Sequence, residues 1–104
     1  MERGEVWWAR LPPPVGRRPV LLLSRNRAYQ IRKSITVAPI TRTIRNIPVE
    51  VPVDETDGMP TRSAVNLDDI LTIPLAVLED RITAISNAKM IQVKEAVVFA
   101  LDLA

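Results

Sequence analysis

Two residue types are missing from this chain of 104 residues, which contains no cysteine and no histidine. Without cysteine, disulfide scaffolds, thiol catalysis and thiolate zinc sites are excluded. Without imidazole, the chain cannot carry a Ser-His-Asp triad, paired-histidine nuclease chemistry or an ordinary transition-metal cluster. We therefore expect neither a metal nor another cofactor, and any catalysis must depend on other side chains.

Glycine and long apolar runs are also scarce. Only Gly4, Gly16 and Gly58 occur, so neither a phosphate-cradling loop nor a dinucleotide fingerprint can be formed. The chain has no stretch of about 18 apolar residues and does not open with a signal peptide. We expect a single domain over residues 1–104, no membrane partner and a cytoplasmic location.

Charge is distributed unevenly along the chain. Ten of the 14 lysines and arginines precede Ile47, together with two of the 12 acids, so residues 1–46 carry a net charge of +8 and the remainder carries −6. Eleven of the cations are arginine, whose planar guanidinium matches phosphate and stacks on bases. This pattern predicts a basic face for nucleic acid, with the acidic stretch from Asp54 to Asp80 away from that ligand.

Short apolar and β-branched segments, separated by proline, glycine and aspartate, are typical of a small β-barrel or half-barrel. The pattern predicts individual strands followed by a strand pair, over residues 5–10, 18–24, 34–39, 47–53 and 63–73. Pro48 and Pro52 favour an edge position for the fourth strand. An acidic turn around Gly58 is expected between residues 54 and 60.

Two helices are predicted in the second half. Pro74 favours the first turn of a short helix through Arg81, followed by a brief strand over residues 82–85. Ser86 is suited to cap a longer helix over residues 87–103. Apolar residues recur in that helix at a spacing that places them on one face, namely Met90, Val93, Val97, Ala100 and Leu101. This face is expected to pack on the barrel.

Four segments occur in an order that can be compared with known families: RGEVWWARLPPP at 3–14, GRRPVLLLS at 16–24, ITVAPITRTIRNIPVEV at 35–51 and DGMPTRSAVNLDDI at 57–70. Together they resemble a MazF/PemK-type toxin of a type II toxin–antitoxin pair. The resemblance implies a mainly β fold, a small SH3-like β-barrel of the MazF/PemK/CcdB type with a closing C-terminal helix, and a homodimer. It also implies a metal-independent endoribonuclease that cleaves single-stranded RNA (mRNA) at selected sequences, arrests growth and is neutralised by a cognate antitoxin.

Two functional positions of that family are an arginine directly before proline at the start of the second strand and a threonine just after the third. Arg18 and Thr41 match them, so the resemblance implies that both are catalytic. The chemistry agrees, because cleavage through the 2′-hydroxyl needs a fixed cation to stabilise negative charge on a five-coordinate phosphorus. Pro19 limits the backbone freedom of Arg18, and the Thr41 hydroxyl can orient a phosphate oxygen and the 2′-hydroxyl.

Three further arginines, Arg17, Arg42 and Arg45, are interpreted as substrate-binding residues that follow RNA phosphates, with a solvated position as the alternative for each. Trp7 and Trp8 are adjacent in a strand, so their side chains should point to opposite faces. The outward one either stacks on a base or packs in the core or a dimer interface.

The sequence does not identify a general base. In several family members the loop before the Arg-Pro pair carries a Gly-Ser-Glu stretch, whereas residues 11–17 read LPPPVGR here and contain no acid. Glu50 and Glu5 are possible substitutes, although a glutamate in a strand is more often solvent-facing. We expect catalysis to rest mainly on electrostatic stabilisation and alignment.

Three other functions fit these residues. A non-catalytic RNA-binding module of the same barrel fold would bind RNA without cutting it. A gyrase-targeting toxin relative would be expected to end in an aromatic residue, whereas this chain ends in leucine and alanine. A pure interaction subunit would use the basic face for an acidic protein, and salt-sensitive binding to RNA but not to acidic protein would argue against it.

Overall fold

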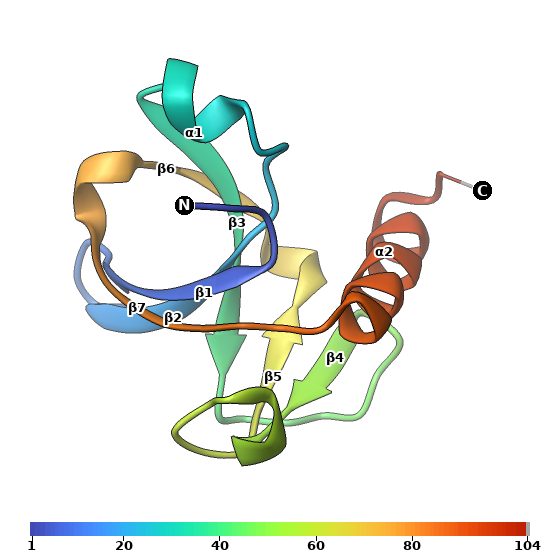
Figure 1. Ribbon diagram of the computed structural model, residues 1–104. Coiled ribbons are helices and arrows are strands. Elements are labelled where there is room, and N and C mark those ends of the chain that lie inside the picture. Colours follow the sequence, from blue (N-terminus) through green and yellow to red (C-terminus); the bar gives the residue numbers. More distant parts are fainter. Residues whose placement is uncertain (104) are drawn as a thin grey trace.

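The computed structural model describes residues 1–103, which form seven strands and two α-helices (Figure 1). The strands are β1 (Glu5–Arg10), β2 (Arg17–Leu22), β3 (Ser34–Thr41), β4 (Glu50–Val53), β5 (Ser63–Asn66), β6 (Leu71–Pro74) and β7 (Leu78–Ala84). The helices are α1 (Ala28–Ile31) and α2 (Asn87–Leu101), and three 3-10 turns connect strands, namely η1 (Glu55–Asp57), η2 (Leu67–Asp69) and η3 (Leu75–Val77). Neither α1 nor α2 has the length and apolar character needed to cross a membrane.

All strand pairs are antiparallel, and the sheet order is β4-β5-β3-β2-β1-β7. The longest strand, β3, joins two parts of the sheet, because residues 34–37 pair with β6 and the last two residues pair with β5. The sheet curls into a barrel-like shape in which β4 and β7 remain as edges (Figure 1). The predicted mainly β fold with a C-terminal helix is confirmed, as is the edge position of the strand that contains Pro52.

The short helix predicted from Pro74 to Arg81 is wrong. Only the single turn η3 forms after Pro74, and the chain then continues as the seven-residue strand β7. This strand pairs with β1, from Glu5 opposite Ala84 to Ala9 opposite Leu78. The pairing satisfies the backbone groups of both strands, so tertiary contact overrides the local helical preference. The carboxylates of β7 are thereby brought beside β1 and β2.

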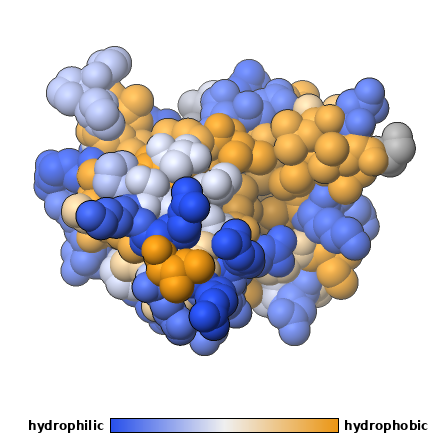
Figure 2. Space-filling model, turned by 90° about the horizontal axis from the view of Figure 1, so that it is seen from above, coloured by the Kyte–Doolittle hydropathy of each residue, from blue (hydrophilic) through white to orange (hydrophobic). Residues whose placement is uncertain are grey.

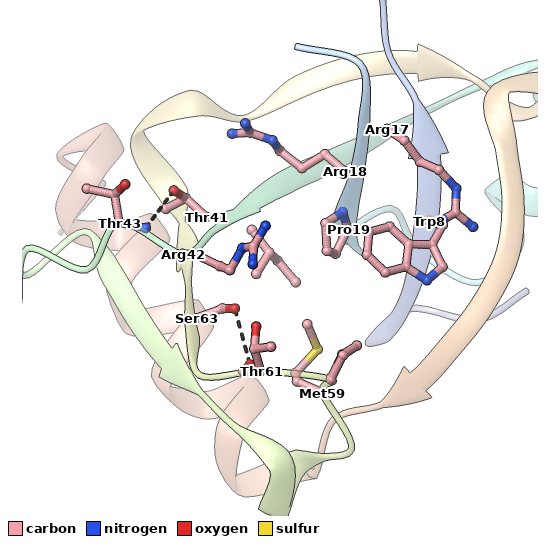
Figure 3. Close-up of a pocket in the computed structure, with 12 residues that line it drawn as sticks. Trp8, Arg17, Arg18, Pro19, Thr41, Arg42, Thr43, Met59, Thr61 and Ser63 are labelled. Carbon is pink, nitrogen blue, oxygen red and sulfur yellow. Dashed lines mark hydrogen bonds between the residues drawn. The ribbon is translucent and has the colours of Figure 1, made fainter.

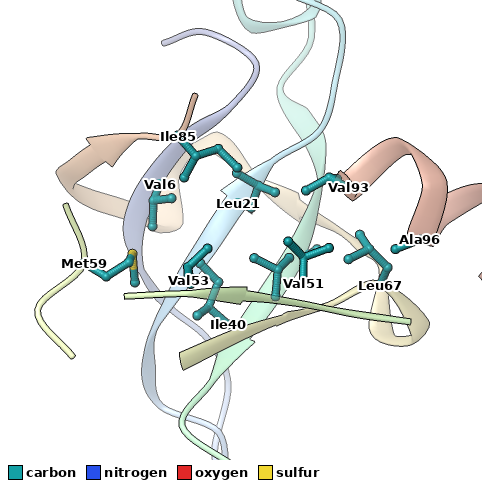
Figure 4. Close-up of a cluster of buried hydrophobic side chains, with 12 residues drawn as sticks. Val6, Leu21, Ile40, Val51, Val53, Met59, Leu67, Ile85, Val93 and Ala96 are labelled. Carbon is teal, nitrogen blue, oxygen red and sulfur yellow. The ribbon is translucent and has the colours of Figure 1, made fainter. Parts of the chain in front are cut away.

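A core of apolar side chains lies between the curled sheet and α2 (Figure 4). Leu21 of β2 is fully buried at its centre, near Val6 of β1 and Val93 of α2. A second cluster, which includes Val20 and Val37, fills the other face of the same strands. Because successive residues of a strand point to opposite faces, β2 supplies side chains to both clusters.

Helix α2 begins as predicted, since the Ser86 hydroxyl oxygen accepts a hydrogen bond from the Lys89 N–H at 3.1 Å. The face of α2 that packs on the sheet is narrower than the predicted apolar face. Val93 and Ala96 are buried, whereas Leu101 is 55% exposed. The final turn of α2 extends beyond the sheet and leaves its apolar side chains uncovered within this chain (Figure 1).

The acidic turn predicted around Gly58 is present as η1, which Asp54 caps by accepting a hydrogen bond from the Thr56 N–H. Gly58 has a φ of +91°, and a Cβ atom there would collide with the side chain of Thr83 on β7. Glycine is therefore needed both for the left-handed conformation and for the close approach to β7. The turn fixes Met59 in the core and directs residues 60–63 toward the open end of β3.

Candidate active site

A cleft of about 400 Å³ lies where β2 begins and β3 ends (Figure 3). Residues from four separate parts of the chain line it: Trp8, Arg17, Arg18, Pro19, Ile40, Thr41, Arg42, Thr43, Met59, Pro60, Thr61 and Ser63. Four of the five residues predicted to catalyse or bind are therefore brought together, and Arg45 is not among them. Figure 3 shows Arg18 reaching across toward the side of Thr41, with Trp8 and Arg17 together on the other side.

The antiparallel pairing of β2 with β3 brings the start of β2, with Arg18, to the end of β3, with Thr41. In the β2–β3 pair, Val20 lies opposite Pro39 and Leu21 opposite Ala38. The paired residues end there, and extending the same register by two residues beyond them would place Arg18 opposite Thr41. Directly opposed residues in an antiparallel pair direct their side chains to the same face of the sheet. Two residues separated by 23 positions in sequence thus line the same cleft.

The Thr41 hydroxyl is partly committed to its own turn. Its Oγ1 accepts a hydrogen bond from the Thr43 N–H at 3.1 Å, which tightens the backbone directly after β3. A hydroxyl has one donor hydrogen and two acceptor lone pairs, so the donor and one lone pair remain for a substrate. The local bond restricts where the oxygen sits and still allows it to contact a phosphate or a 2′-hydroxyl.

The cleft is basic, and its lining within residues 1–103 contains no carboxylate. In the same part of the chain, Arg18 and Arg42 have no acid within ion-pair distance. Arg18 is half-buried, whereas Arg42 is exposed. A guanidinium that is partly withdrawn from water and has no internal counterion favours an anion brought by a ligand.

Arg17 is held differently from Arg18. Its Nε donates to Glu79 Oε1 at 2.9 Å and its Nη2 donates to Asp80 Oδ2 at 3.3 Å, while its guanidinium carbon lies 4.4 Å from the centre of the Trp8 ring. Glu79 also accepts from Arg10 Nε at 3.0 Å. The hydrogen bonds from Arg17 and then Arg10 lower the pKa of Glu79 below its ordinary value, so this carboxylate stays ionised. The end of the acidic stretch therefore reaches the cleft rim, contrary to the sequence-based expectation.

Five other cations of the N-terminal half form a second group far from the cleft. Arg3, Arg25, Arg27, Arg32 and Lys33 are exposed around α1, at the start of β3, and Figure 2 shows hydrophilic side chains on this face. Strand β3 has eight residues and spans roughly 24 Å at a rise of about 3.4 Å per residue. The predicted basic surface is thus divided between the two ends of this strand.

Arg45 lies outside the cleft and is tied to Glu50. The backbone N–H of Arg45 donates to Glu50 Oε1 at 2.8 Å, and the side-chain Nε of Arg45 lies 3.5 Å from Glu50 Oε2. The Glu50 side chain is only 2% exposed, so the expectation that it faces solvent is wrong. Glu5 is also engaged elsewhere, since its Oε1 accepts from Trp7 Nε1 at 2.9 Å. Neither carboxylate considered as a general base lines the cleft.

Glu50 instead organises the loop between β3 and β4, which leads to a stability prediction. Glu50→Ala should lower the free energy of unfolding by about 1–3 kcal/mol, because the Arg45 N–H loses its acceptor and a buried contact is lost. Glu50→Gln should cost less than about 1 kcal/mol, because it keeps an acceptor oxygen and loses only a pair with an exposed arginine. Urea unfolding measures both, with exposed Glu95→Ala as the control; equal losses in both Glu50 variants would contradict this role.

The sequence did not single out the loop residues that complete the cleft, Pro60, Thr61 and Ser63. Ser63 donates its hydroxyl hydrogen to the Thr61 carbonyl at 3.2 Å, which stabilises the loop (Figure 3). Nothing in the local pattern marks these residues, because their position depends on the turn at Gly58 and on the pairing of β5 with β3. They belong to the DGMPTRSAVNLDDI segment of the resemblance, which assigned them no role.

Comparison with known sequences gives matches over almost the entire chain. Residues 2–101 match the model of a family described as PemK-like, MazF-like toxin of type II toxin-antitoxin system. The chain is 41% identical over 101 residues to the probable endoribonuclease MazF5 of Mycobacterium tuberculosis, an alignment that covers 96% of this chain and 92% of that relative.

Solved structures give the same result. The Mycobacterium tuberculosis toxin MazF-mt6 superimposes with a TM-score of 0.89 at 35% identity, covering 96% of this chain and 98% of that one. An endoribonuclease in complex with its cognate antitoxin, from Mycobacterial species, also gives a TM-score of 0.89, at 27% identity, covering 100% and 97%.

Proposed function

This chain belongs to the PemK-like, MazF-like toxin family of type II toxin–antitoxin systems, and from this membership we propose that it is an endoribonuclease that cuts single-stranded RNA in the cytoplasm and arrests growth. The observation that carries the proposal is that Arg18 and Thr41 line the same basic cleft, with Arg18 reaching toward the side of Thr41 (Figure 3). These are the two positions at which the family's functional arginine and threonine are expected.

Arg18 is proposed to stabilise the transition state of phosphoryl transfer. The 2′-oxygen attacks the adjacent phosphorus and loses its proton, while the bond from phosphorus to the 5′-oxygen breaks and that oxygen gains a proton. Negative charge builds on the non-bridging oxygens, where an unpaired guanidinium stabilises it most. Pro19 keeps the strand backbone at Arg18 restricted, so little reorganisation is required.

Thr41 is proposed to align the reacting groups. Its free donor hydrogen can bind a phosphate oxygen, and its remaining lone pair can accept from the 2′-hydroxyl. Because arginine stays protonated and the described cleft lining has no carboxylate, water is the proposed carrier of the proton that leaves the 2′-oxygen. This scheme requires no metal ion and predicts a modest rate.

A homodimer and an antitoxin are the proposed protein partners. Exposed apolar side chains on and just beyond α2 support an interface there: Ile91, Phe99, Leu101 and Leu103 are each more than half exposed. Figure 2 shows hydrophobic surface over this helix. An antitoxin tail that carries acids and bulky apolar residues would suit the basic cleft and the apolar surface.

One alternative is favoured by a specific observation. The absence of a carboxylate from the cleft lining within residues 1–103 fits a module that binds RNA without cutting it. In that case Arg18 and Thr41 would contribute to affinity only. The two functions differ in whether bound RNA remains intact.

The deciding experiment is incubation of the purified protein with a long single-stranded RNA in excess EDTA, followed by mapping of fragment ends. We expect discrete cuts at a recurring short motif in the wild type. Thr41→Ala should reduce the cleavage rate by about 100-fold, because misplacement of a reacting group by about 1 Å has that effect. Thr72→Ala, which removes an exposed hydroxyl on β6, should leave the rate unchanged.

Each other outcome has a distinct meaning. RNA that is bound but intact would support the non-catalytic module. Cutting that requires a divalent ion and is abolished by EDTA would contradict metal independence. Cutting by the Thr41→Ala variant at the wild-type rate would remove Thr41 from the mechanism.

A further inference from the structure

Arg17 and Trp8 form a stacked pair at the rim of the cleft. The guanidinium carbon lies 4.4 Å from the indole centroid, and both side chains line the cleft (Figure 3). The side chain of Arg17 is 40% exposed, so the pair is accessible from solvent. Stacking of a cation on indole immobilises both planar groups, which lowers the entropic cost of placing a third planar group against them.

The polar edge of Arg17 is already occupied. Its Nε and Nη2 donate to Glu79 and Asp80, and Arg10 shares the Glu79 carboxylate. Two cations and two carboxylates therefore meet here, and the cluster has no net charge. A phosphate would gain little from it, in contrast to the unpaired guanidinium of Arg18. The planar faces of the Trp8–Arg17 pair are what remain for a ligand.

A β-bulge brings both carboxylates to this position. In the β1–β7 pair, Trp7 lies opposite Arg81 and Ala9 opposite Leu78, with a register shift between them. Trp8 is therefore faced by two residues, Glu79 and Asp80. An extra residue in one strand re-aims side chains that a regular ladder would send to opposite faces, and bulges are common beside active sites. Here both acids reach the same guanidinium.

We propose that one nucleobase of the RNA stacks on the Trp8–Arg17 pair, and that Glu79 and Asp80 are positioning residues that hold Arg17 against the indole. The inference rests on the proposed function, since it assumes that RNA occupies the cleft, and it adds a base-recognition subsite to it. Arg17 thus acts through its flat face and not as a phosphate clamp. Nucleobases stack well on tryptophan and arginine, which gives a protein a means of sensing single-stranded bases.

The test uses RNA of the mapped cleavage motif with a 2′-deoxynucleotide at the cut site, so that binding is measured without cleavage. A series of such oligonucleotides lacks one base at a time. For each position, the Kd of the abasic RNA is divided by the Kd of the intact RNA. This ratio isolates the contribution of the base, because changes in overall charge affect both Kd values equally.

At one position the wild-type ratio should be about 5 to 150, the range expected when a stacked base is lost. In Trp8→Leu the ratio at that position should fall to about 1, and Trp8→Phe should restore part of it. Trp7→Phe, which changes the neighbouring tryptophan on the other face of β1, should not alter it. Ratios that remain at the wild-type value in folded Trp8→Leu, at every position, would overturn the subsite.

The positioning role is tested by a double-mutant cycle. Glu79→Ala should lower the ratio in the wild-type background, and Glu79→Gln, which keeps an acceptor for Arg17, should lower it less. In an Arg17→Ala background, Glu79→Ala should change the ratio by less than about twofold, since it acts through Arg17. Equal effects in the two backgrounds would show that Glu79 acts independently.

These results separate the two proposals. If RNA is cut at a defined motif but the Kd ratio depends on Trp8 at no position, the proposed function stands and the subsite is rejected. If instead the wild type binds long RNA without cutting it, the ribonuclease proposal fails. The abasic series can then be repeated on the segment of RNA that binds most tightly. A position at which the Kd ratio falls in Trp8→Leu would uphold the subsite, and no such position would reject it.

Discussion

Arg18→Ala is expected to lower the rate of RNA cleavage by at least about 10²–10³-fold, the range found when one donor to a developing oxyanion is removed. The side chain is half-buried at the start of β2, lines the same cleft as Thr41, and has no acid within ion-pair distance among residues 1–103. Its loss removes the charge that the pentacoordinate phosphorus requires and leaves the hydrophobic core unchanged. Single-turnover cleavage of a motif-containing RNA measures the effect, and growth of cells that express the variant gives an independent readout.

Two further variants distinguish a local role from general electrostatic attraction. Arg18→Lys keeps the charge but loses the planar fork, so it should retain only part of the rate. Arg25→Ala removes the same charge from the exposed group around α1, at the far end of β3, and should cut RNA at close to the wild-type rate. If a folded Arg18→Ala protein still arrested growth, or if Arg25→Ala were equally inactive, Arg18 could not be the electrostatic catalyst.

Much of the fold could be predicted because its strands are marked by local signals. The run EVWWAR before three prolines, the apolar run after Pro19, and the alternating residues from Ser34 all form strands close to the expected bounds. Ser86 caps α2 through its own side chain, a contact that spans only three residues. Such features depend on near neighbours in sequence and are therefore visible there.

The errors arise where distant parts of the chain meet. The segment after Pro74 resembles a helix locally, yet pairing with β1 makes it a strand and places Glu79 and Asp80 beside Arg17. Glu50 reads as a solvent-facing residue of an edge strand, yet β4 packs against α2, and the Glu50 side chain is buried and accepts a hydrogen bond from the Arg45 backbone N–H. In both cases the deciding contact joins residues that no local pattern connects.

The candidate site could be proposed only in part. Arg18 and Thr41 could be named from the resemblance, and the structure places both in the lining of one cleft, while their roles remain predictions. The position of Arg45 outside the cleft and the engagement of Arg17 with Trp8 could not be foreseen. A basic sequence indicates how many cations are present, but carboxylate neighbours decide which of them are available to a ligand.

The second large effect concerns the core that supports β2. Leu21→Ala should lower the free energy of unfolding by about 2–5 kcal/mol, a substantial part of the about 5–15 kcal/mol typical of a domain. Leu21 is fully buried and lies opposite Val6 on β1 and Ala38 on β3, with Val93 of α2 nearby (Figure 4). Ala38 is small, so Leu21 fills the space above it, and truncation would leave a cavity that three hydrogen-bonded strands cannot readily close.

Urea unfolding at one fixed protein concentration measures this effect, because dimerisation would make stability depend on concentration. Ile31→Ala on α1 is the control, since that side chain is 57% exposed and its truncation should change stability by less than about 0.5 kcal/mol. An unchanged urea midpoint for Leu21→Ala would mean that the cluster in Figure 4 is not the principal core. Because Leu21 follows Arg18 by three residues on the same strand, its loss should also weaken the alignment of Arg18 with Thr41, so cleavage should decline before global unfolding begins.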